Sequence, residues 1–152
     1  KIFCEKTPIF DIINIPLSNT PEIIIMTGFP GAGKSTIARH ICENKNYIHI
    51  QGDVYKTSTK MIKASIEHII QGKSIIFDAT NSSFKKRLEY ITIANKYNLP
   101  ITCVHVSVSS NTAFKRNRLR MDKKQVPKIA YSVYSKYYNE PTEKEGFTLY
   151  VV

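Results

Sequence analysis

A glycine-rich stretch at residues 28–36, GFPGAGKST, constrains the fold of this chain more than any other part of the sequence. It matches the spacing G-x-x-x-x-G-K-[ST] without a gap. The apolar run at residues 22–26 before it is typical of a buried strand, and Ile37, Ala38 and Ile41 after it recur at helical spacing. A strand, a glycine-rich loop and a helix in this order predict a loop that wraps phosphate groups.

The residue types in this loop suit a nucleoside triphosphate. Glycines let backbone N–H groups close around phosphate oxygens, Lys34 reaches the β and γ oxygens, and the Ser35 hydroxyl ligates magnesium. The alternative is a glycine-rich turn without a ligand. The candidate nucleotide-binding residues are Gly28, Gly31, Ala32, Gly33, Lys34, Ser35 and Thr36.

The chain has 152 residues, which is enough for one domain built on a central sheet. Residues 1–21 contain Pro8, Pro16 and Pro21, and prolines at this density prevent a regular helix. We expect these residues to form an extended arm or linker and residues 22–152 to form the domain. Lys1 stands where a methionine is usual, which suggests a fragment of a longer chain with a region upstream.

The balance of charges favours a polyanionic partner. Lysine and arginine number 22 against 12 aspartates and glutamates, a formal net charge of +10. The alternative is that the basic residues serve only solubility, or that the abundance of lysine reflects an AT-rich genome.

Three cysteines without a C-x-x-C pair indicate reduced thiols in an intracellular protein of the nucleus or cytoplasm, with Cys42 and Cys103 in the core. No apolar run approaches the ~20 residues of a membrane span.

Further apolar runs follow the loop, separated by segments of helical periodicity. We predict strands at residues 47–50, 74–77, 101–106 and 147–152, and helices at residues 54–71, at 83–97 and after Pro127. Strands separated by helices of this length imply βαβ units. The predicted fold class is therefore α/β, with a mainly parallel central sheet and helices on both faces.

Two aspartates lie at the ends of predicted strands, where the ligand crevice of an open α/β sheet is found. Asp53 follows the second strand and is a functional carboxylate, the N-cap of the next helix, or both. Asp78 follows the third strand directly, and a carboxylate there typically holds the magnesium shell; its alternative is a turn or cap role. His49, inside the second strand, is interpreted as a structural histidine.

Residues 112–124 are strongly basic. As a helix they place Arg116 and Arg120 on one face, where both could clamp a triphosphate or stabilise a transferring phosphoryl group. The alternative is a solvated basic helix or a nuclear localisation signal. In the next helix Tyr134, Tyr137 and Tyr138 are interpreted as core packing, with base stacking as the alternative.

The order of these signals resembles the 5'-kinase domain of polynucleotide kinase, in both the eukaryotic form fused to a 3'-phosphatase and the bacteriophage form. The resemblance covers residues 21–152. The residues of the loop at 28–36 match those of the eukaryotic enzymes. It implies the P-loop kinase fold, with ATP and Mg²⁺ as cofactors. It also implies transfer of the ATP γ-phosphate to the 5'-hydroxyl end of DNA or RNA in end repair, by a chain whose upstream region carries a 3'-phosphatase.

The resemblance implies roles for residues outside the loop. Asp53 matches the aspartate that takes the proton from the attacking hydroxyl, and residues 78–81 resemble a D-x-T-N element that would place Thr80 and Asn81 at the substrate. Arg87 falls where the family has a substrate-side arginine. Residues 115–120 resemble an arginine-rich helical lid, whose paired arginines would be Arg116 and Arg120.

The acceptor side departs from the family. Gly52 stands where relatives usually have an arginine, and Lys56 could replace that charge at the substrate only in part, because it cannot make a bidentate phosphate contact. The tryptophan that helps to position nucleic acid in the eukaryotic enzymes is absent, and nothing matches the phosphatase motif D-x-D-G-T. Two other functions stay open: a small-molecule or nucleoside kinase, and a catalytically idle nucleic-acid-binding module that retains ATP.

Overall fold

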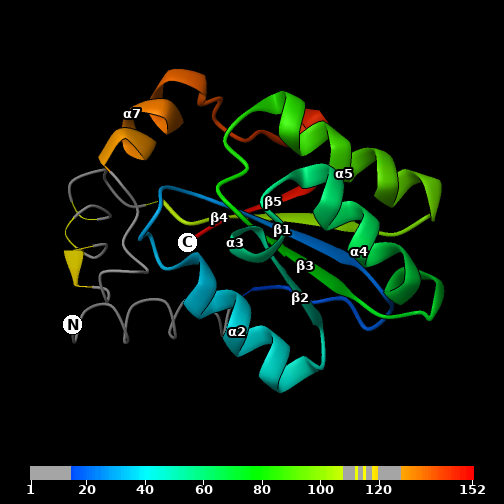
Figure 1. Ribbon diagram of the computed structural model, residues 1–152. Coiled ribbons are helices and arrows are strands. Elements are labelled where there is room, and N and C mark those ends of the chain that lie inside the picture. Colours follow the sequence, from blue (N-terminus) through cyan, green and yellow to red (C-terminus); the bar gives the residue numbers. More distant parts are fainter. Residues whose placement is uncertain (1–14, 108–111, 113–114, 116–117, 120–127) are drawn as a thin grey trace.

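A parallel sheet of five strands forms the centre of the computed structural model (Figure 1), which describes residues 15–107, 112, 115, 118–119 and 128–152. Its strand order is β2-β3-β1-β4-β5, and every neighbouring pair is parallel. The strands are β1 (Ile23–Thr27), β2 (Ile48–Gln51), β3 (Ile75–Asp78), β4 (Ile101–His105) and β5 (Thr148–Val151). The predicted α/β class is confirmed, and the sheet is wholly parallel.

The central position of β1 determines where the glycine-rich loop lies. All five residues of β1 are buried, because β3 and β4 flank it and helices cover both faces. Isoleucine dominates this strand, as expected where both faces of a parallel sheet are covered. The chain leaves β1 at the carboxyl edge of the sheet, so the loop opens into the crevice where α/β proteins bind ligands.

Helices cover both faces of the sheet, as Figure 1 shows. Helix α2 packs on one face through Ile37, Ala38 and Ile41, while α4 and α5 pack on the other. The described part of the chain contains the helices α2 (Lys34–Lys45), α3 (Gly52–Tyr55), α4 (Ser58–Ile70), α5 (Phe84–Lys96) and α7 (Lys128–Tyr137), with a short 3₁₀ helix η2 (Glu143–Glu145). In Figure 1, α7 lies beyond the carboxyl ends of the strands.

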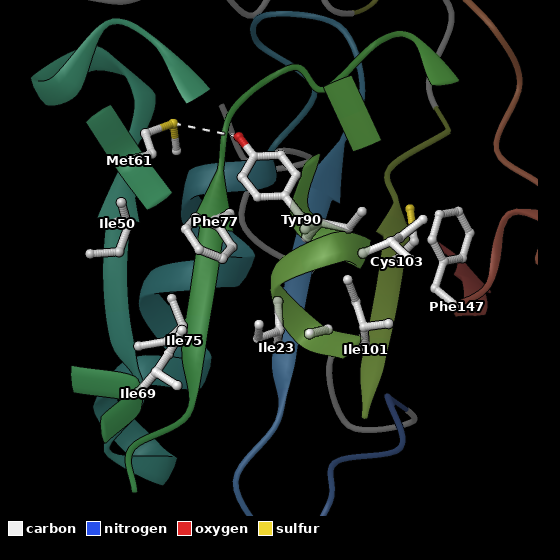
Figure 2. Packing of buried hydrophobic residues seen from close by; sticks show 13 residues of the cluster. Ile23, Ile50, Met61, Ile69, Ile75, Phe77, Tyr90, Ile101, Cys103 and Phe147 are labelled. Carbon is white, nitrogen blue, oxygen red and sulfur yellow. Dashed lines mark hydrogen bonds between the residues drawn. The ribbon is translucent and has the colours of Figure 1, made fainter. Parts of the chain in front are cut away.

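The core under α4 and α5 contains the largest buried aromatic rings (Figure 2). The rings of Phe77 and Tyr90 lie 4.5 Å apart, and the Tyr90 hydroxyl contacts the Met61 sulfur at 3.7 Å. Burying a side chain of this kind stabilises a fold by about 1.5–3 kcal/mol. Cys103 belongs to this core, and Cys42 packs against the core under α2; both carry free thiols.

The helix predicted at residues 54–71 is two helices in the structure. Lys56 adopts a positive φ of 73° and ends α3, which begins at Gly52. The Thr57 side chain then accepts a hydrogen bond from the Lys60 N–H and caps α4. The prediction of one continuous helix was wrong. The sequence has no glycine or proline at the break, and these are the residues that usually indicate one.

Two predicted segments lie mainly outside the described residues. Of the N-terminal arm, residues 15–21 are described, and Ile15 is buried in the core under α2. Of the basic segment at residues 112–124, the structure describes Thr112, Lys115, Arg118 and Leu119. Among the described residues, no helix combines the length and the apolar character needed to cross a bilayer.

Candidate functional site

A pocket of about 1280 Å³ opens at the carboxyl edge of the sheet. Five parts of the chain contribute to its wall: the glycine-rich loop with the start of α2, the segment from β2 to α4, the end of β3 with the loop after it, α5, and α7. The predicted site residues on this wall are Gly31, Lys34, Ser35, Asp53, Lys56, Asp78, Thr80 and Asn81. The strand ends therefore bring the two aspartates and the loop into one pocket.

The glycine-rich loop packs tightly against the end of β4. Gly28 has a φ of 151°, and a Cβ atom there would lie 2.8 Å from the carbonyl oxygen of Val106. Gly33 has a φ of 106° and is the N-cap of α2. Because a glycine cap brings no side-chain oxygen to the first N–H groups of the helix, phosphate oxygens suit this position.

Helix α7 holds the loop from the other side. The Tyr131 hydroxyl donates a hydrogen bond to the Pro30 carbonyl oxygen, and the Phe29 ring packs on Tyr134 with centroids 4.3 Å apart. Tyr131 and Tyr134 are buried, so the core interpretation of the tyrosines holds for Tyr134. Tyr137 is 58% exposed and lines the pocket, where a ring could stack on a base.

Lys34 and Ser35 begin α2 at the pocket. Lys34 is 8% exposed, and its ammonium donates to the carbonyl oxygen of Phe29 at 2.8 Å. The Ser35 hydroxyl donates to Asp78 Oδ2 at 2.8 Å. Gly28, Ala32, Gly33 and Thr36 belong to the same turn but do not line the pocket, and their contact with a nucleotide stays a prediction.

Asp78 is a buried carboxylate at the end of β3. Its Oδ2 contacts both Ser35 Oγ and His49 Nε2, each at 2.8 Å. Burial alone would raise the pKa of Asp78, but the hydrogen bonds from His49 and Ser35 and the charge of Lys34 outweigh it and hold the pKa below its ordinary value. The ionised form of the carboxylate is therefore favoured.

The pair of Ser35 and Asp78 suits magnesium shared with a nucleotide. Magnesium usually keeps several waters and takes one or two carboxylates together with substrate phosphates. Among the described residues, no group of three or more His, Cys, Asp or Glu side chains gathers into a metal site. A magnesium ion here would thus depend on phosphate oxygens for the rest of its ligands.

Sequence reasoning missed the contact of His49 with the site. The histidine was interpreted as structural, yet its ring nitrogen reaches the carboxylate that faces Ser35. In the parallel register of β2 and β3, His49 pairs with Ile76, so His49 and Asp78 lie on the same face of the sheet. Alternation along one strand does not give this register, so the contact could not be found from sequence.

Asp53 lies in the first turn of α3 and is exposed on the pocket wall beside Gly52 and Lys56. The alternative reading of Asp53 as the N-cap of the following helix was wrong, since Thr57 caps α4 and Gln51 precedes α3. Asp53 follows β2, the strand at one edge of the sheet, whereas the glycine-rich loop follows the central strand β1.

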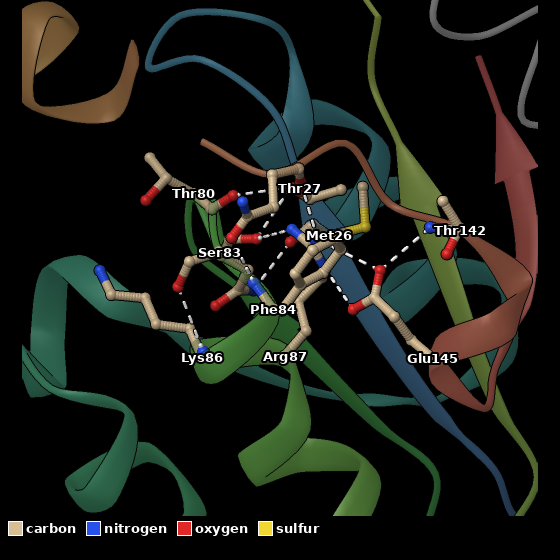
Figure 3. Close-up of polar contacts among 11 residues, drawn as sticks. Met26, Thr27, Thr80, Ser83, Phe84, Lys86, Arg87, Thr142 and Glu145 are labelled. Carbon is tan, nitrogen blue, oxygen red and sulfur yellow. Dashed lines mark hydrogen bonds and ion pairs between the residues drawn. The ribbon is translucent and has the colours of Figure 1, made fainter. Parts of the chain in front are cut away.

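Thr80 and Asn81 hold the loop after β3 against the end of β1 (Figure 3). The Thr27 hydroxyl donates to the carbonyl oxygens of Thr80 and Asn81 at 2.8 and 3.1 Å. The Asn81 amide nitrogen donates to the Met26 carbonyl oxygen at 2.7 Å, and its side chain is buried. Both residues also line the pocket, so a substrate contact stays a prediction.

Arg87 does not take the place expected for a substrate contact. Its side chain is completely buried, and it is not part of the pocket lining. Nε donates to Glu145 at 2.9 Å, while the two terminal nitrogens donate to the carbonyl oxygens of Asn81 and Asn139 at 2.9 and 2.7 Å. Figure 3 shows this guanidinium between the loop after β3 and η2. The described contacts correct the expectation: Arg87 joins segments of the fold.

The predicted lid arginines, Arg116 and Arg120, lie outside the described residues. Their clamp on a triphosphate remains a prediction. Within the described part of the pocket, the cations on the wall besides Lys34 are Lys56, Lys85, Lys86 and Lys136. The acids on this wall besides Asp78 are Asp53 and Glu89, and both oxygens of Glu89 accept hydrogen bonds from Ser58.

The sequence is similar to that of a curated protein. A bifunctional polynucleotide phosphatase/kinase of Schizosaccharomyces pombe is 37% identical over 134 residues, which cover 86% of this chain and 33% of that protein. The chain thus spans about a third of the length of this curated relative.

Solved structures share the fold at low sequence identity. Chaetomium thermophilum Kti12 in complex with ADP-AlF3 has a TM-score of 0.62 at 18% identity, covering 86% of this chain and 88% of that one. A gluconokinase from Sinorhizobium meliloti has a TM-score of 0.60 at 16% identity, covering 89% and 85%. The family model described as an AAA domain matches residues 23–141, from β1 to the segment after α7, and the chain belongs to this family.

Proposed function

We propose that this chain is a phosphotransferase that moves the γ-phosphoryl group of ATP to the 5'-hydroxyl end of DNA or RNA. One observation carries the proposal: Lys34, Ser35 and Asp78 share a single pocket with the exposed carboxylate of Asp53. The first three residues suit a magnesium nucleotide, and the fourth suits an acceptor hydroxyl. The polynucleotide phosphatase/kinase from Schizosaccharomyces pombe supports the choice of nucleic acid as acceptor.

The glycine-rich loop forms the donor half of the proposed site. Backbone N–H groups of the loop and of the first turn of α2 would bind the β and γ phosphates, with Lys34 as a cation at the same oxygens. Ser35 and Asp78 would hold magnesium, which when bound neutralises charge on the phosphates. The loop residues proposed to bind the nucleotide are Gly28, Gly31, Ala32, Gly33, Lys34, Ser35 and Thr36.

Asp53 is the proposed proton acceptor in the other half. The oxygen of the 5'-hydroxyl attacks the γ-phosphorus, the hydroxyl proton passes to the Asp53 carboxylate, and ADP leaves with the bridging oxygen. Because the transition state of phosphoryl transfer is loose, the carboxylate contributes mainly by orienting the hydroxyl in line with the phosphorus. Its exposed position on the pocket wall supports this role.

Lysines on the pocket wall support an anionic acceptor. Lys56, Lys85, Lys86 and Lys136 are exposed on this wall. Together with Lys34 they are five cations against the three acids Asp53, Asp78 and Glu89, so the described wall carries an excess of positive charge. A nucleic-acid strand brings phosphates that these lysines would neutralise, and its binding would therefore weaken as salt rises. Thr80 and Asn81 are proposed to contact the same strand.

Three parts of the proposal rest on the relative and the resemblance. Arg116 and Arg120 are proposed to close over the triphosphate as a lid and to stabilise its charge during transfer. The full-length protein is proposed to carry a 3'-phosphatase, because the Schizosaccharomyces pombe relative is a bifunctional polynucleotide phosphatase/kinase. An intracellular location belongs to the same proposal.

The test is transfer of labelled phosphate from ATP to three acceptors in the same assay: a 5'-hydroxyl DNA, a 5'-hydroxyl RNA and a nucleoside. We expect label on at least one of the oligonucleotides, with a rate that falls steeply as salt rises. Preference for the nucleoside would instead assign a small-molecule kinase on the same fold. Nucleotide binding without transfer to any of the three would assign an idle module that retains ATP.

A further inference from the structure

His49 lies on β2, the strand at one edge of the sheet, and its ring contacts the donor half of the site. Its Nε2 is 2.8 Å from Asp78 Oδ2, and the Ser35 hydroxyl donates to that same oxygen at 2.8 Å. The side chain of His49 is 16% exposed, and that of Asp78 is 3% exposed. The contact is therefore sheltered from water, which strengthens a hydrogen bond to a charged group.

The direction of this hydrogen bond follows from the charge of its partner. An ionised carboxylate can only accept, so the proton in this contact belongs to His49 Nε2. A neutral imidazole is sufficient for this donation. Two donors on Oδ2, one from β2 and one from α2, fix the torsion of a carboxylate that otherwise can rotate about its last side-chain bond.

We propose that His49 is a positioning residue for the magnesium nucleotide: it holds the Asp78 carboxylate beside Ser35 before the ligand arrives. This inference rests on the proposed binding of magnesium and ATP but does not depend on the acceptor. A carboxylate fixed in advance loses less side-chain freedom when it receives a magnesium-bound water. Partners of this kind, one step removed from the metal, typically change metal affinity by about 10–100-fold when they are removed.

The experiment measures binding of methylanthraniloyl-ADP by fluorescence while magnesium chloride is titrated, with no acceptor present. His49→Leu removes the donor and keeps an apolar side chain against the core. We expect this variant to need roughly tenfold more magnesium for half-maximal binding. Its nucleotide affinity in EDTA should equal that of the wild type, because the loop is unchanged.

His49→Gln tests whether the donor itself matters, because its amide nitrogen can replace Nε2. We expect its magnesium requirement to stay within about threefold of the wild type. His40→Leu is the matched control on α2, where the described contact of His40 is a hydrogen bond from the Asn44 amide to its carbonyl oxygen. This variant should bind as the wild type does.

A second readout needs neither magnesium nor nucleotide. Carbon-13 NMR of the Asp78 carboxyl in the ligand-free chain should show a higher pKa in His49→Leu than in the wild type, with His49→Gln closer to the wild type. The inference is overturned if His49→Leu keeps the wild-type magnesium dependence, if the Leu and Gln variants are weakened equally, or if His49→Leu loses nucleotide equally with and without magnesium. Wild-type binding without transfer to any acceptor would contradict the proposed function and leave this result standing.

Discussion

Asp78 and Arg87 are both charged and almost completely buried, yet their charges serve different ends. Asp78 sits on the pocket wall and has its carboxylate held by Ser35 and His49. Arg87 lies behind that wall and satisfies two carbonyl oxygens and Glu145. A buried charge is costly unless it is paired and hydrogen-bonded, so both environments are explained by their partners.

We predict that Arg87→Met destabilises the fold, because it leaves the Glu145 carboxylate in a poorly hydrated site without its cation. The loss in the free energy of unfolding should be about 3–5 kcal/mol, measured by urea denaturation. Lys96→Met, at the exposed end of the same helix, is the control and should cost far less. Wild-type stability combined with weakened oligonucleotide binding would restore the substrate role for Arg87.

His105 gives the fold a pH dependence. Burial lowers the pKa of His105 below its ordinary value of 6.5, with Glu140 opposing this shift and Arg87 adding to it. The unfolded chain therefore binds this proton more readily than the folded chain, and stability decreases as pH falls from about 6.5 through the lower folded pKa. At pH values above the pKa of His105 in the unfolded chain, this histidine is neutral in both the folded and the unfolded state and does not lower the stability.

The measurement is the urea midpoint from neutral to mildly acidic pH for the wild type, His105→Gln and the control His40→Gln. His105→Gln should show a shallower decrease on acidification because it cannot take up the proton. Equal slopes for His105→Gln and the wild type would show that His105 does not cause the decrease.

Among the elements, the loop that joins β1 to α2 leaves no room for a Cβ atom at Gly28. Gly28 and Gly72 both have φ values in the left-handed region, at 151° and 80°. A Cβ atom at Gly28 would meet the Val106 carbonyl oxygen at 2.8 Å, whereas a Cβ atom at Gly72 would have no neighbour within 4 Å. Substitutions at these two positions therefore separate the cost of backbone strain from the cost of a steric collision.

We predict that Gly28→Ala costs more stability than Gly72→Ala, since both variants carry backbone strain of about 1–3 kcal/mol and Gly28→Ala adds the collision. Displacement of the loop should also weaken nucleotide binding in Gly28→Ala but not in Gly72→Ala. Thermal unfolding with and without ADP measures both effects. Equal costs for the two substitutions, with unchanged ADP binding, would mean that the loop tolerates the side chain.

Elements were predictable from sequence where the signal is local. Apolar runs predicted the strands within about a residue or two, and the signal was strongest for the central strands β1, β3 and β4, which are almost wholly buried. The break between α3 and α4 escaped prediction because Lys56 adopts a positive φ that lysine seldom takes. The role of Arg87 escaped as well, since its partners Glu145 and Asn139 are 58 and 52 residues away in the chain.

At the scale of the whole molecule, the parallel sheet makes the candidate site possible. Its strand order places the ends of β1 and β3 side by side, with β2 next to β3. The candidate site residues lie at or after these three strand ends: Lys34, Ser35, Asp78 and Asp53. The rule that ligands bind outside the carboxyl ends of strands was therefore enough to predict their shared pocket. The packing of α7 against the loop could not be predicted, because it depends on contacts over 100 residues apart such as that of Tyr131 with Pro30, 101 positions away.

We propose that the pocket at the carboxyl edge of the sheet receives both a phosphate donor and a hydroxyl acceptor, with Asp53 on the acceptor side. Asp53→Asn keeps the shape of the side chain but removes its capacity to take a proton. Glu43→Gln makes the same change at an exposed residue of α2 that does not line the pocket.

The decisive measurement is the single-turnover rate of label transfer from ATP to a 5'-hydroxyl oligonucleotide, taken together with ATP affinity. For Asp53→Asn we predict a rate about 10²–10⁴-fold below that of the wild type, with unchanged ATP affinity. Glu43→Gln should match the wild type in both quantities. A near-wild-type transfer rate in Asp53→Asn, with ATP still bound, would mean that Asp53 is not the proton acceptor.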